Sequence, residues 1–125
     1  MVAMIRSGID LVEIERLEAS ILRHGDRFLN RIFTQQEQSD CAGKVESLAA
    51  RFAAKEAASK ALGCGIGQVS WLDIEVLRNS DHQPLLFLHG AAHDLANKLK
   101  LTIWSVSLSH TRQNAIAMVI ASGEY

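Results

Sequence analysis

Residues 51–63 read RFAAKEAASKALG and form the centre of the most alanine-rich part of this chain of 125 residues. Seven alanines lie between Leu48 and Leu62, and Gly63 follows them. Alanine has the highest helix propensity and glycine commonly ends helices, so the pattern predicts one helix over residues 45–62. Because alanine side chains are small, neighbouring backbone can approach this helix unusually closely. We therefore expect a buried helix.

Shorter elements flank this helix on both sides. Before it we predict a strand over residues 2–10, a helix over 11–23 and a short helix over 26–32, and Thr34 and Glu37 form the capping box of a third helix. After it we predict strands over 71–77 and 85–88 around a turn at 79–84, a helix over 91–100, and a final hairpin of residues 103–108 and 115–121. In the first of these strands Leu72, Ile74 and Val76 should share one face. Helices combined with antiparallel hairpins predict a domain of the α+β class, with an antiparallel sheet packed on helices.

The last predicted strand differs from an ordinary half-buried one. Residues 115–121 read AIAMVIA and do not alternate between apolar and polar side chains. A strand of this kind is typical of burial on both faces. We expect the second face to be covered by another subunit.

Length and composition restrict the function classes. The chain is long enough for a single domain over residues 1–125, and 48% hydrophobic with 22% charged residues is typical of a soluble globular protein. A net charge of −1 argues against a nucleic-acid binder, and no apolar run is long enough to span a membrane. The start is too short for a signal peptide, and Cys41 and Cys64 lack metal-type spacing, so we expect free thiols in a cytoplasmic protein.

Asp10 lies where the first predicted strand gives way to a helix. An aspartate at that place is usually a helix cap, because its carboxylate satisfies free backbone amides. The alternative is an oxygen ligand for Mg²⁺, which needs few protein ligands when a substrate supplies phosphate oxygens. Taken alone, the position favours the cap.

The alanine-rich helix carries a second candidate. Its residues Phe52, Glu56, Ser59 and Lys60 share one side with Gly63. A glutamate four residues before a lysine is usually a solvated pair that stabilises the helix. The alternative is a carboxylate on a metal with an ammonium one turn away on a phosphate. The alanine-rich flanks favour it slightly, because they indicate a buried helix, where isolated charges are costly.

Two further motifs are weak. GCGIG at residues 63–67 follows a helix rather than joining a strand to one, so it is not a dinucleotide-binding loop, and a helix C-terminus repels phosphate. Any anion near it must be held by side chains such as Lys44, Arg51 or Lys60. SLSHT at residues 107–111 suggests a hydrolase, but the chain contains no nucleophile elbow, and its histidines show no zinc motif.

Two motifs together are much more specific than either one. GIDLVEI at residues 8–14 and RFAAKEAASKALG at 51–63 resemble the two signatures of the holo-acyl-carrier-protein synthases, in the 4′-phosphopantetheinyl transferase superfamily. Their order and separation also fit, and the resemblance covers essentially the whole chain. It implies transfer of 4′-phosphopantetheine from coenzyme A to a serine of apo-acyl carrier protein, and a homotrimer with active sites between subunits. The competing hypothesis is a non-catalytic oligomeric module that binds coenzyme A or another nucleotide.

The resemblance also implies roles for individual residues. Asp10 and Glu56 would hold Mg²⁺ against the pyrophosphate of coenzyme A. Glu56 would accept the serine proton, directly or through a metal-bound water, and Lys60 would sit on the pyrophosphate and stabilise the departing phosphate. The nucleotide end of coenzyme A would contact Arg51 and His110, with Lys44, Gly63 and Gly65 as weaker candidates.

A docking surface for the acidic carrier protein is expected at Arg16, Arg23 and Arg27. Two positions depart from the family pattern. Val12 stands where larger two-lobed relatives carry a third acid, so water is expected to complete the metal shell. His82-Gln83-Pro84 replaces the usual Gly-Lys-Pro turn, so a lysine contact expected there is missing.

Overall fold

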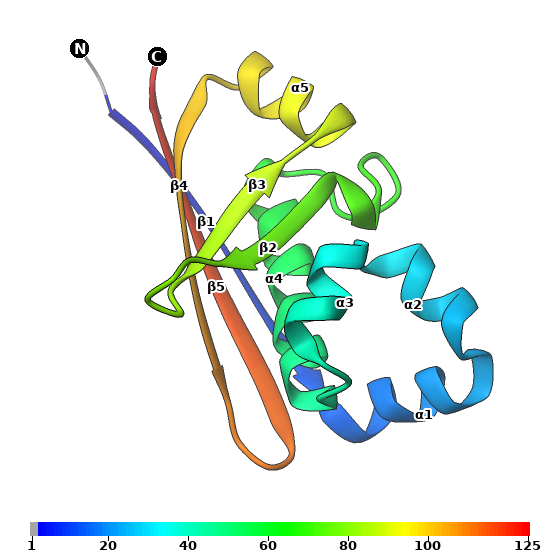
Figure 1. Ribbon diagram of the computed structural model, residues 1–125. Helices are drawn as coiled ribbons and strands as arrows, with labels where there is room; N and C mark the ends of the chain where they lie inside the picture. The colour runs from blue at the N-terminus through cyan, green and yellow to red at the C-terminus, as the bar shows by residue number, and fades with distance from the viewer. Residues whose placement is uncertain (1–2) are drawn as a thin grey trace.

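The computed structural model describes residues 3–125 and has the predicted α+β architecture (Figure 1). In chain order the elements are β1 (Ala3–Glu13), α1 (Ile14–His24), α2 (Asp26–Ile32), α3 (Gln35–Cys41), α4 (Val45–Leu62), the 3₁₀ turn η1 (Trp71–Asp73), β2 (Ile74–Arg78), β3 (Pro84–Leu88), α5 (Gly90–Lys98), β4 (Leu101–His110) and β5 (Asn114–Glu124).

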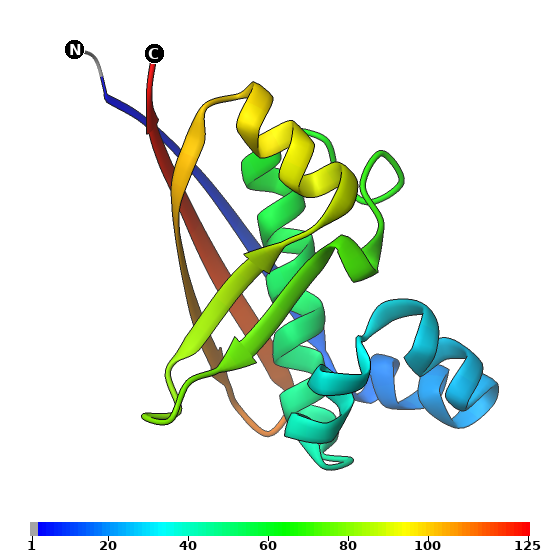
Figure 2. The same ribbon diagram turned by 45° about the horizontal axis from the view of Figure 1, so that its top comes forward.

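The strands form two antiparallel sheets. One is three-stranded in the order β1-β5-β4, and the other is the β2–β3 hairpin. Helix α4 lies between them, while α1, α2 and α3 gather at one end of the molecule and α5 lies near the other (Figure 2). The two ends of the chain lie side by side, because Ala3 pairs with Glu124. The alanine-rich helix is therefore the centre of the fold.

Helix α4 lies almost directly on the backbone of β1. A Cβ atom added at Gly8 would be only 1.8 Å from the carbonyl oxygen of Ala57, so position 8 accepts no side chain while the helix stays in place. Small side chains of the helix make this close approach possible, and all seven of its alanines are buried (Ala49, Ala50, Ala53, Ala54, Ala57, Ala58 and Ala61). From the sheet, β5 adds Ala115, Ala117, Val119 and Ala121 to the same packed layer. The glycine of the first motif thus lets the second motif approach it.

The first strand is longer than predicted. It runs to Glu13, and residues 10–13 keep pairing with residues 114–117 of β5. The helix predicted from Leu11 therefore starts three residues later, at Ile14. The strand continues to Glu13 because β5 is long enough to extend the hydrogen-bonded ladder. Asp10 is not a helix cap: the N-cap of α1 is Glu13, which makes no side-chain capping bond. Val2, predicted in this strand, lies outside the described residues.

The stretch 71–77 begins with a turn rather than a strand. Ser70 and Asp73 form a capping box that opens η1, so the strand starts only at Ile74. Leu72 is consequently 40% exposed and does not share the buried face of Ile74 and Val76. The local capping pattern outweighs the alternation of the sequence at this point.

The remaining predicted elements are confirmed with shifts of a few residues at their ends. The Thr34–Glu37 capping box is present, with the Glu37 amide donating to Thr34 Oγ1 at 3.1 Å. His82 has a φ of 62°, in the left-handed region that favours the glycine usual at this turn in the family. Cys41 and Cys64 are free thiols. Within residues 3–125, no helix is long and apolar enough to span a bilayer.

The last strand alternates in burial although its sequence does not alternate in polarity. Its alanines and Val119 face α4, whereas Ile116 and Met118 point to the opposite side and are exposed. Together with Ile5, Ile9 and Leu11 of β1 they form an apolar outer face of the three-stranded sheet, and no part of residues 3–125 covers it. Within the single chain, β5 is therefore buried on the face towards α4 but not on its outer face, although burial of both faces is predicted.

Candidate active site

Three charged side chains of the two motifs converge where β1 passes α4. The Nζ atom of Lys60 donates to Asp10 Oδ1 at 3.2 Å and to the carbonyl oxygen of Ile9 at 2.9 Å. The Lys60 side chain is 51% exposed and that of Asp10 20%, so the pair is open to a ligand from solvent. The contact exists because the close approach of α4 to Gly8 brings the next inward-facing residue of β1 beside the helix.

Glu56 completes this cluster. Partial burial raises the pKa of Glu56 above its ordinary value, the nearby carboxylate of Asp10 raises it further, and Lys60 opposes the shift. This contribution is a repulsion between like charges, which a bound cation would relieve. The three residues predicted to carry the chemistry are therefore neighbours in the structure.

The donor set fits a magnesium ion. Mg²⁺ prefers oxygen ligands, and in phosphate-transferring sites one or two carboxylates hold it together with substrate phosphates and water. Asp10 and Glu56 supply such oxygens, and no group of three or more His, Cys, Asp or Glu side chains suited to a metal exists among residues 3–125. Val12, at the place of a third acid, is partly buried and packs against the core. Asp10 and Glu56 could thus serve as two protein ligands of such an ion.

A groove of about 360 Å³ opens directly beside Asp10. Most of its wall is apolar, and Arg16 brings a positive charge to it. Its lining comes from β1, α1, α2 and α4: Asp10, Leu11, Val12, Glu13, Arg16, Leu17, Ser20, Phe28 and Phe52. The sequence analysis missed this groove, because no motif spans the four elements that build it.

The glycine-rich loop lies just beyond Lys60. Gly63 ends α4 with a φ of 78°, and Gly65 has a φ of 79°, both in the left-handed region. The amides of Cys64 and Gly65 both donate to the carbonyl oxygen of Ser59, which folds the loop back onto the last turn of the helix. The two predicted glycines therefore lie near Lys60, at the C-terminal end of α4.

Lys44 and His110 lie at the opposite end of α4. Lys44 is the N-cap of the helix, and exposed His110 lines a cavity with Glu46, Thr111 and Arg112. Lys44 and Lys60 are 16 residues apart, which corresponds to about 24 Å along the helix. Within one chain the structure does not bring these two groups of phosphate-binding candidates together. His110 also makes no hydrogen bond to a serine within residues 3–125; its Nδ1 atom contacts the Thr111 carbonyl at 3.3 Å.

Arg51 is in the core and is not available to a phosphate in this chain. Its side chain is 1% exposed, and its guanidinium donates to the carbonyl oxygens of Val76 at 3.2 Å and Ser47 at 3.4 Å. The alanine-rich flanks indicate a buried helix, but Lys60 itself is half exposed. The charges that α4 does bury are Arg51 and Lys55, one turn apart on the side facing β2.

The three arginines of the predicted docking surface are exposed. Arg16 and Arg23 lie on α1, and Arg27 lies at the start of α2. Arg16 also lines the groove beside Asp10, and its guanidinium is 3.9 Å from the Glu13 carboxylate. One member of the set is therefore next to the charged cluster.

Comparisons with known proteins identify the family of this chain. Residues 6–119 match the 4′-phosphopantetheinyl transferase superfamily. The chain is 48% identical over 127 residues to a holo-acyl-carrier-protein synthase of Herpetosiphon aurantiacus, covering 96% of this chain and 100% of the relative. It is 49% identical over 118 residues to a synthase of the same name from Dehalococcoides mccartyi, covering 94% of this chain and 98% of the relative.

Solved structures give the same result. The Helicobacter pylori holo-acyl-carrier-protein synthase in complex with coenzyme A superposes with a TM-score of 0.85 at 38% identity, covering 94% of this chain and 99% of that one. The synthase from Bacillus anthracis in complex with coenzyme A (3′,5′-ADP) gives a TM-score of 0.80 at 35% identity, covering 98% and 100%. With these matches and both sequence signatures in place, the chain belongs to the holo-acyl-carrier-protein synthases of the 4′-phosphopantetheinyl transferase superfamily.

Proposed function

We propose that this protein transfers 4′-phosphopantetheine from coenzyme A to a serine hydroxyl of an acidic apo-acyl carrier protein, in a reaction that depends on Mg²⁺. The observation that carries the proposal is the meeting of Asp10, Glu56 and Lys60 beside an open groove. Proteins similar to this chain carry the synthase name, and two of the solved structures are described in complex with coenzyme A.

In the proposed step the serine oxygen attacks the phosphorus that bears the pantetheine arm. A new P–O bond forms to serine, the P–O bond of the pyrophosphate bridge breaks, and adenosine 3′,5′-bisphosphate leaves with the bond electrons. Glu56 accepts the serine proton, directly or through a water, which is the usual role of a carboxylate acting as a general base.

Lys60 serves the leaving phosphate. Its ammonium is half exposed and is held by Asp10 and a backbone carbonyl, so it can exchange these contacts for phosphate oxygens. Asp10 and Glu56 would hold Mg²⁺, which when bound supplies positive charge to the pyrophosphate and its departing half.

We further propose that the active site is completed by a second copy of the chain in a homotrimer. Lys60, Gly63 and Gly65 lie at one end of α4 and Lys44 and His110 at the other, too far apart to hold one nucleotide within a chain. The exposed apolar outer face, built by β1 and β5, offers a surface for such an assembly.

The trimer has a direct test. Mixing Lys60→Ala and His110→Ala chains should restore activity that each lacks alone, since some mixed sites would contain both wild-type residues. Native mass spectrometry should give a trimer that Met118→Asp dissociates, whereas Leu22→Asp, an exposed control position on α1, leaves it intact. A mixture no more active than its components would place both residues of a site in one chain.

The carrier protein is proposed to dock on Arg16, Arg23 and Arg27. These side chains are exposed, they carry the charge opposite to that of an acidic carrier, and Arg16 reaches the groove beside Asp10. Reversing Arg16 and Arg23 to Glu should raise KM for the carrier while coenzyme A binding stays unchanged. The charge reversal Lys98→Glu on α5 is the control. Loss of coenzyme A binding in the double variant would contradict the assignment.

One experiment separates the enzyme from the competing hypothesis of a non-catalytic oligomeric module that binds coenzyme A or a nucleotide. The protein is incubated with coenzyme A, Mg²⁺ and apo-acyl carrier protein, and the carrier is weighed by mass spectrometry. A gain of one phosphopantetheine group is expected. No gain, where an active control synthase gives one, would leave only the binding module.

A further inference from the structure

Helix α4 packs mainly through small side chains, and its buried leucines, Leu48 and Leu62, lie towards its two ends. Seven of its residues are buried alanines, and the contact with Gly8 is a flat approach of backbone to backbone. Large interlocking side chains normally fix such a contact, and alanines supply few of them. Besides the stacking of Phe52 on Trp71, the middle of the helix is therefore held in its orientation by polar contacts.

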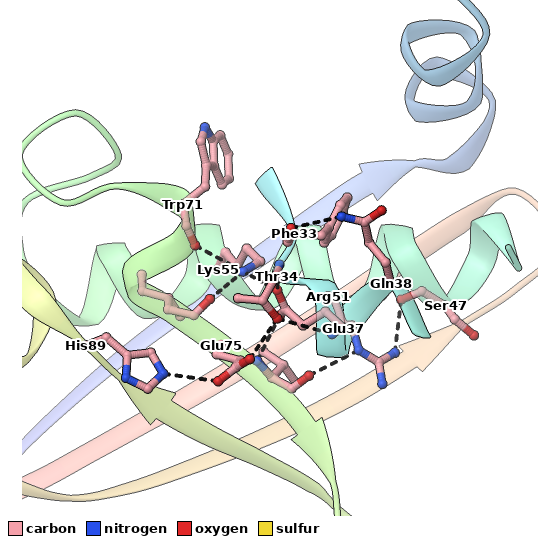
Figure 3. Close-up of polar contacts among 12 residues, drawn as sticks. Phe33, Thr34, Glu37, Gln38, Ser47, Arg51, Lys55, Trp71, Glu75 and His89 are labelled. Atoms are coloured by element: carbon pink, nitrogen blue, oxygen red, sulfur yellow. Dashed lines mark hydrogen bonds and ion pairs between the residues drawn. The ribbon is translucent and has the colours of Figure 1, made fainter. Parts of the chain in front are cut away.

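Lys55 attaches α4 to three other elements of the protein. Its side chain is completely buried, and its ammonium donates to Glu37 Oε1 at 2.8 Å, to the Trp71 carbonyl at 3.0 Å and to the Ile74 carbonyl (Figure 3). A lysine ammonium has three donors, and here each has a partner. One side chain thus ties the helix to α3, η1 and β2.

Glu37 is fixed equally firmly on the other side of this ion pair. Besides Lys55, its carboxylate accepts the backbone amides of Thr34 and Val76, each at 2.9 Å. Arg51, one turn before Lys55, adds a bond to the Val76 carbonyl at 3.2 Å. Two attachments one helical turn apart, both to β2, prevent rotation of α4 as well as sliding.

The orientation of α4 decides where Glu56 points. Glu56 follows Lys55 directly and lies about 100° further around the helix. A rotation of about 20° would move a carboxylate that lies roughly 5–6 Å from the helix axis by about 2 Å. Oxygen ligands of Mg²⁺ must lie at about 2.0–2.1 Å in a nearly regular octahedron, so a shift of this size would remove Glu56 from a site shared with Asp10.

A stabilising role alone explains the buried pair poorly. Withdrawing an ammonium and a carboxylate from water is costly, and well-packed apolar side chains often hold a fold equally well. We propose that Lys55 and Glu37 are positioning residues, which set the rotation of α4 so that Glu56 and Lys60 face Asp10. This inference rests on the proposed transferase function.

The test compares two variants with a matched control. Lys55→Met removes the ammonium, and Glu37→Gln keeps the length of the side chain while removing its charge. Glu75→Gln is the control: Glu75 is a neighbouring glutamate on β2 that bonds to Thr34 and His89 but makes no bond to α4. For each chain, thermal unfolding, kcat, KM for coenzyme A and the Mg²⁺ concentration for half-maximal rate are measured at a temperature where the chain is folded.

Misplacing a catalytic group by about 1 Å can cost about 100-fold in rate. We therefore expect folded Lys55→Met to lose about 100-fold and Glu37→Gln about tenfold in kcat, with a higher Mg²⁺ requirement and little change in KM for coenzyme A. Glu75→Gln should stay within about twofold of wild type. Inactive wild-type protein would refute the proposed function itself. Active wild type with unchanged kcat in folded Glu37→Gln or Lys55→Met, equal losses in Glu75→Gln, or failure of both test variants to fold would overturn the positioning role.

Discussion

Helix α4 carries two lysine–carboxylate pairs that lie in opposite environments. In the first pair, Lys55 Nζ lies 2.8 Å from Glu37 Oε1, and both side chains are completely buried. In the second pair, five residues further along the helix, Lys60 Nζ lies 3.2 Å from Asp10 Oδ1, and the lysine side chain is 51% exposed. The same two chemical groups therefore occur once inside the core and once at the open site.

The difference in environment assigns the two pairs different roles: the buried pair holds α4 in place, and the open pair can take part in the reaction. Burial lowers the pKa of Lys55, which the Glu37 carboxylate opposes, and the many bonds of this pair make it difficult to exchange for another partner. An exposed pair such as Lys60–Asp10 contributes only about 0–1 kcal/mol, so its lysine can leave for a phosphate at little cost. A phosphate-transferring site needs an exchangeable pair such as Lys60–Asp10. A helix that packs mainly through alanines needs a fixed pair such as Lys55–Glu37.

The largest expected effect concerns activity at the open site. Glu56→Gln removes the proposed base and one proposed Mg²⁺ ligand, and we expect kcat to fall by about 10³-fold, since general bases contribute about 10²–10⁴-fold. The free energy of unfolding should not fall, because burial and the Asp10 charge disfavour the ionised form of Glu56, and a neutral glutamine is subject to neither effect. Mass spectrometry of the carrier measures the rate, with Asp94→Asn on α5 as a control. Nearly normal turnover in Glu56→Gln would refute both roles.

The next effect concerns stability at the buried pair. Lys55→Ala leaves the Glu37 carboxylate buried without its partner, and breaking such a pair typically costs about 3–5 kcal/mol. Urea unfolding followed by circular dichroism measures this loss in the free energy of unfolding. A loss below about 1 kcal/mol, the range of exposed pairs, would show that the two pairs do not differ as the structure indicates.

A smaller stability effect is expected for Lys60. Lys60→Ala should change the free energy of unfolding by less than about 1 kcal/mol, because its ion pair is exposed and Asp10 remains accessible to water. The same variant should lose most of its transfer rate. A destabilisation as large as that of Lys55→Ala would mean that Lys60 is a structural residue as well.

Sequence patterns predicted the open site better than the buried pair. Asp10, Glu56 and Lys60 belong to two motifs of a known family, and the structure brings them together. Arg51 and Lys55 belong to the same motif, yet the arginine was assigned to a nucleotide and the lysine to nothing. Helical spacing shows which residues share a side of α4. Which side is buried depends on packing against β2 and α3, which are distant in sequence.

The fold shows the same limit. The alanine-rich helix, the Thr34–Glu37 capping box and the last hairpin were predictable, because local propensity and tertiary packing agree there. The end of β1 was not, because residues 11–13 fit a helix or a strand equally well, and pairing with β5 decides between them. The groove beside Asp10 needs four elements in place, so no local pattern could predict it.

The smallest expected effect is a pH dependence of stability that arises at Glu56 of the open site. Burial raises the pKa of Glu56 in the folded protein, with a further contribution from Asp10. The folded chain therefore binds a proton there that the unfolded chain releases, so this contribution to stability is present at low pH and is lost as pH rises through the raised pKa. Without Mg²⁺, Glu56→Gln should melt slightly above wild type at pH 7. The difference in Tm should vanish below the ordinary titration range of a glutamate. Calorimetry in EDTA buffers measures it, and the reverse trend, with Glu56→Gln falling below wild type as pH rises, would mean that Lys60 outweighs burial and Asp10 at this carboxylate.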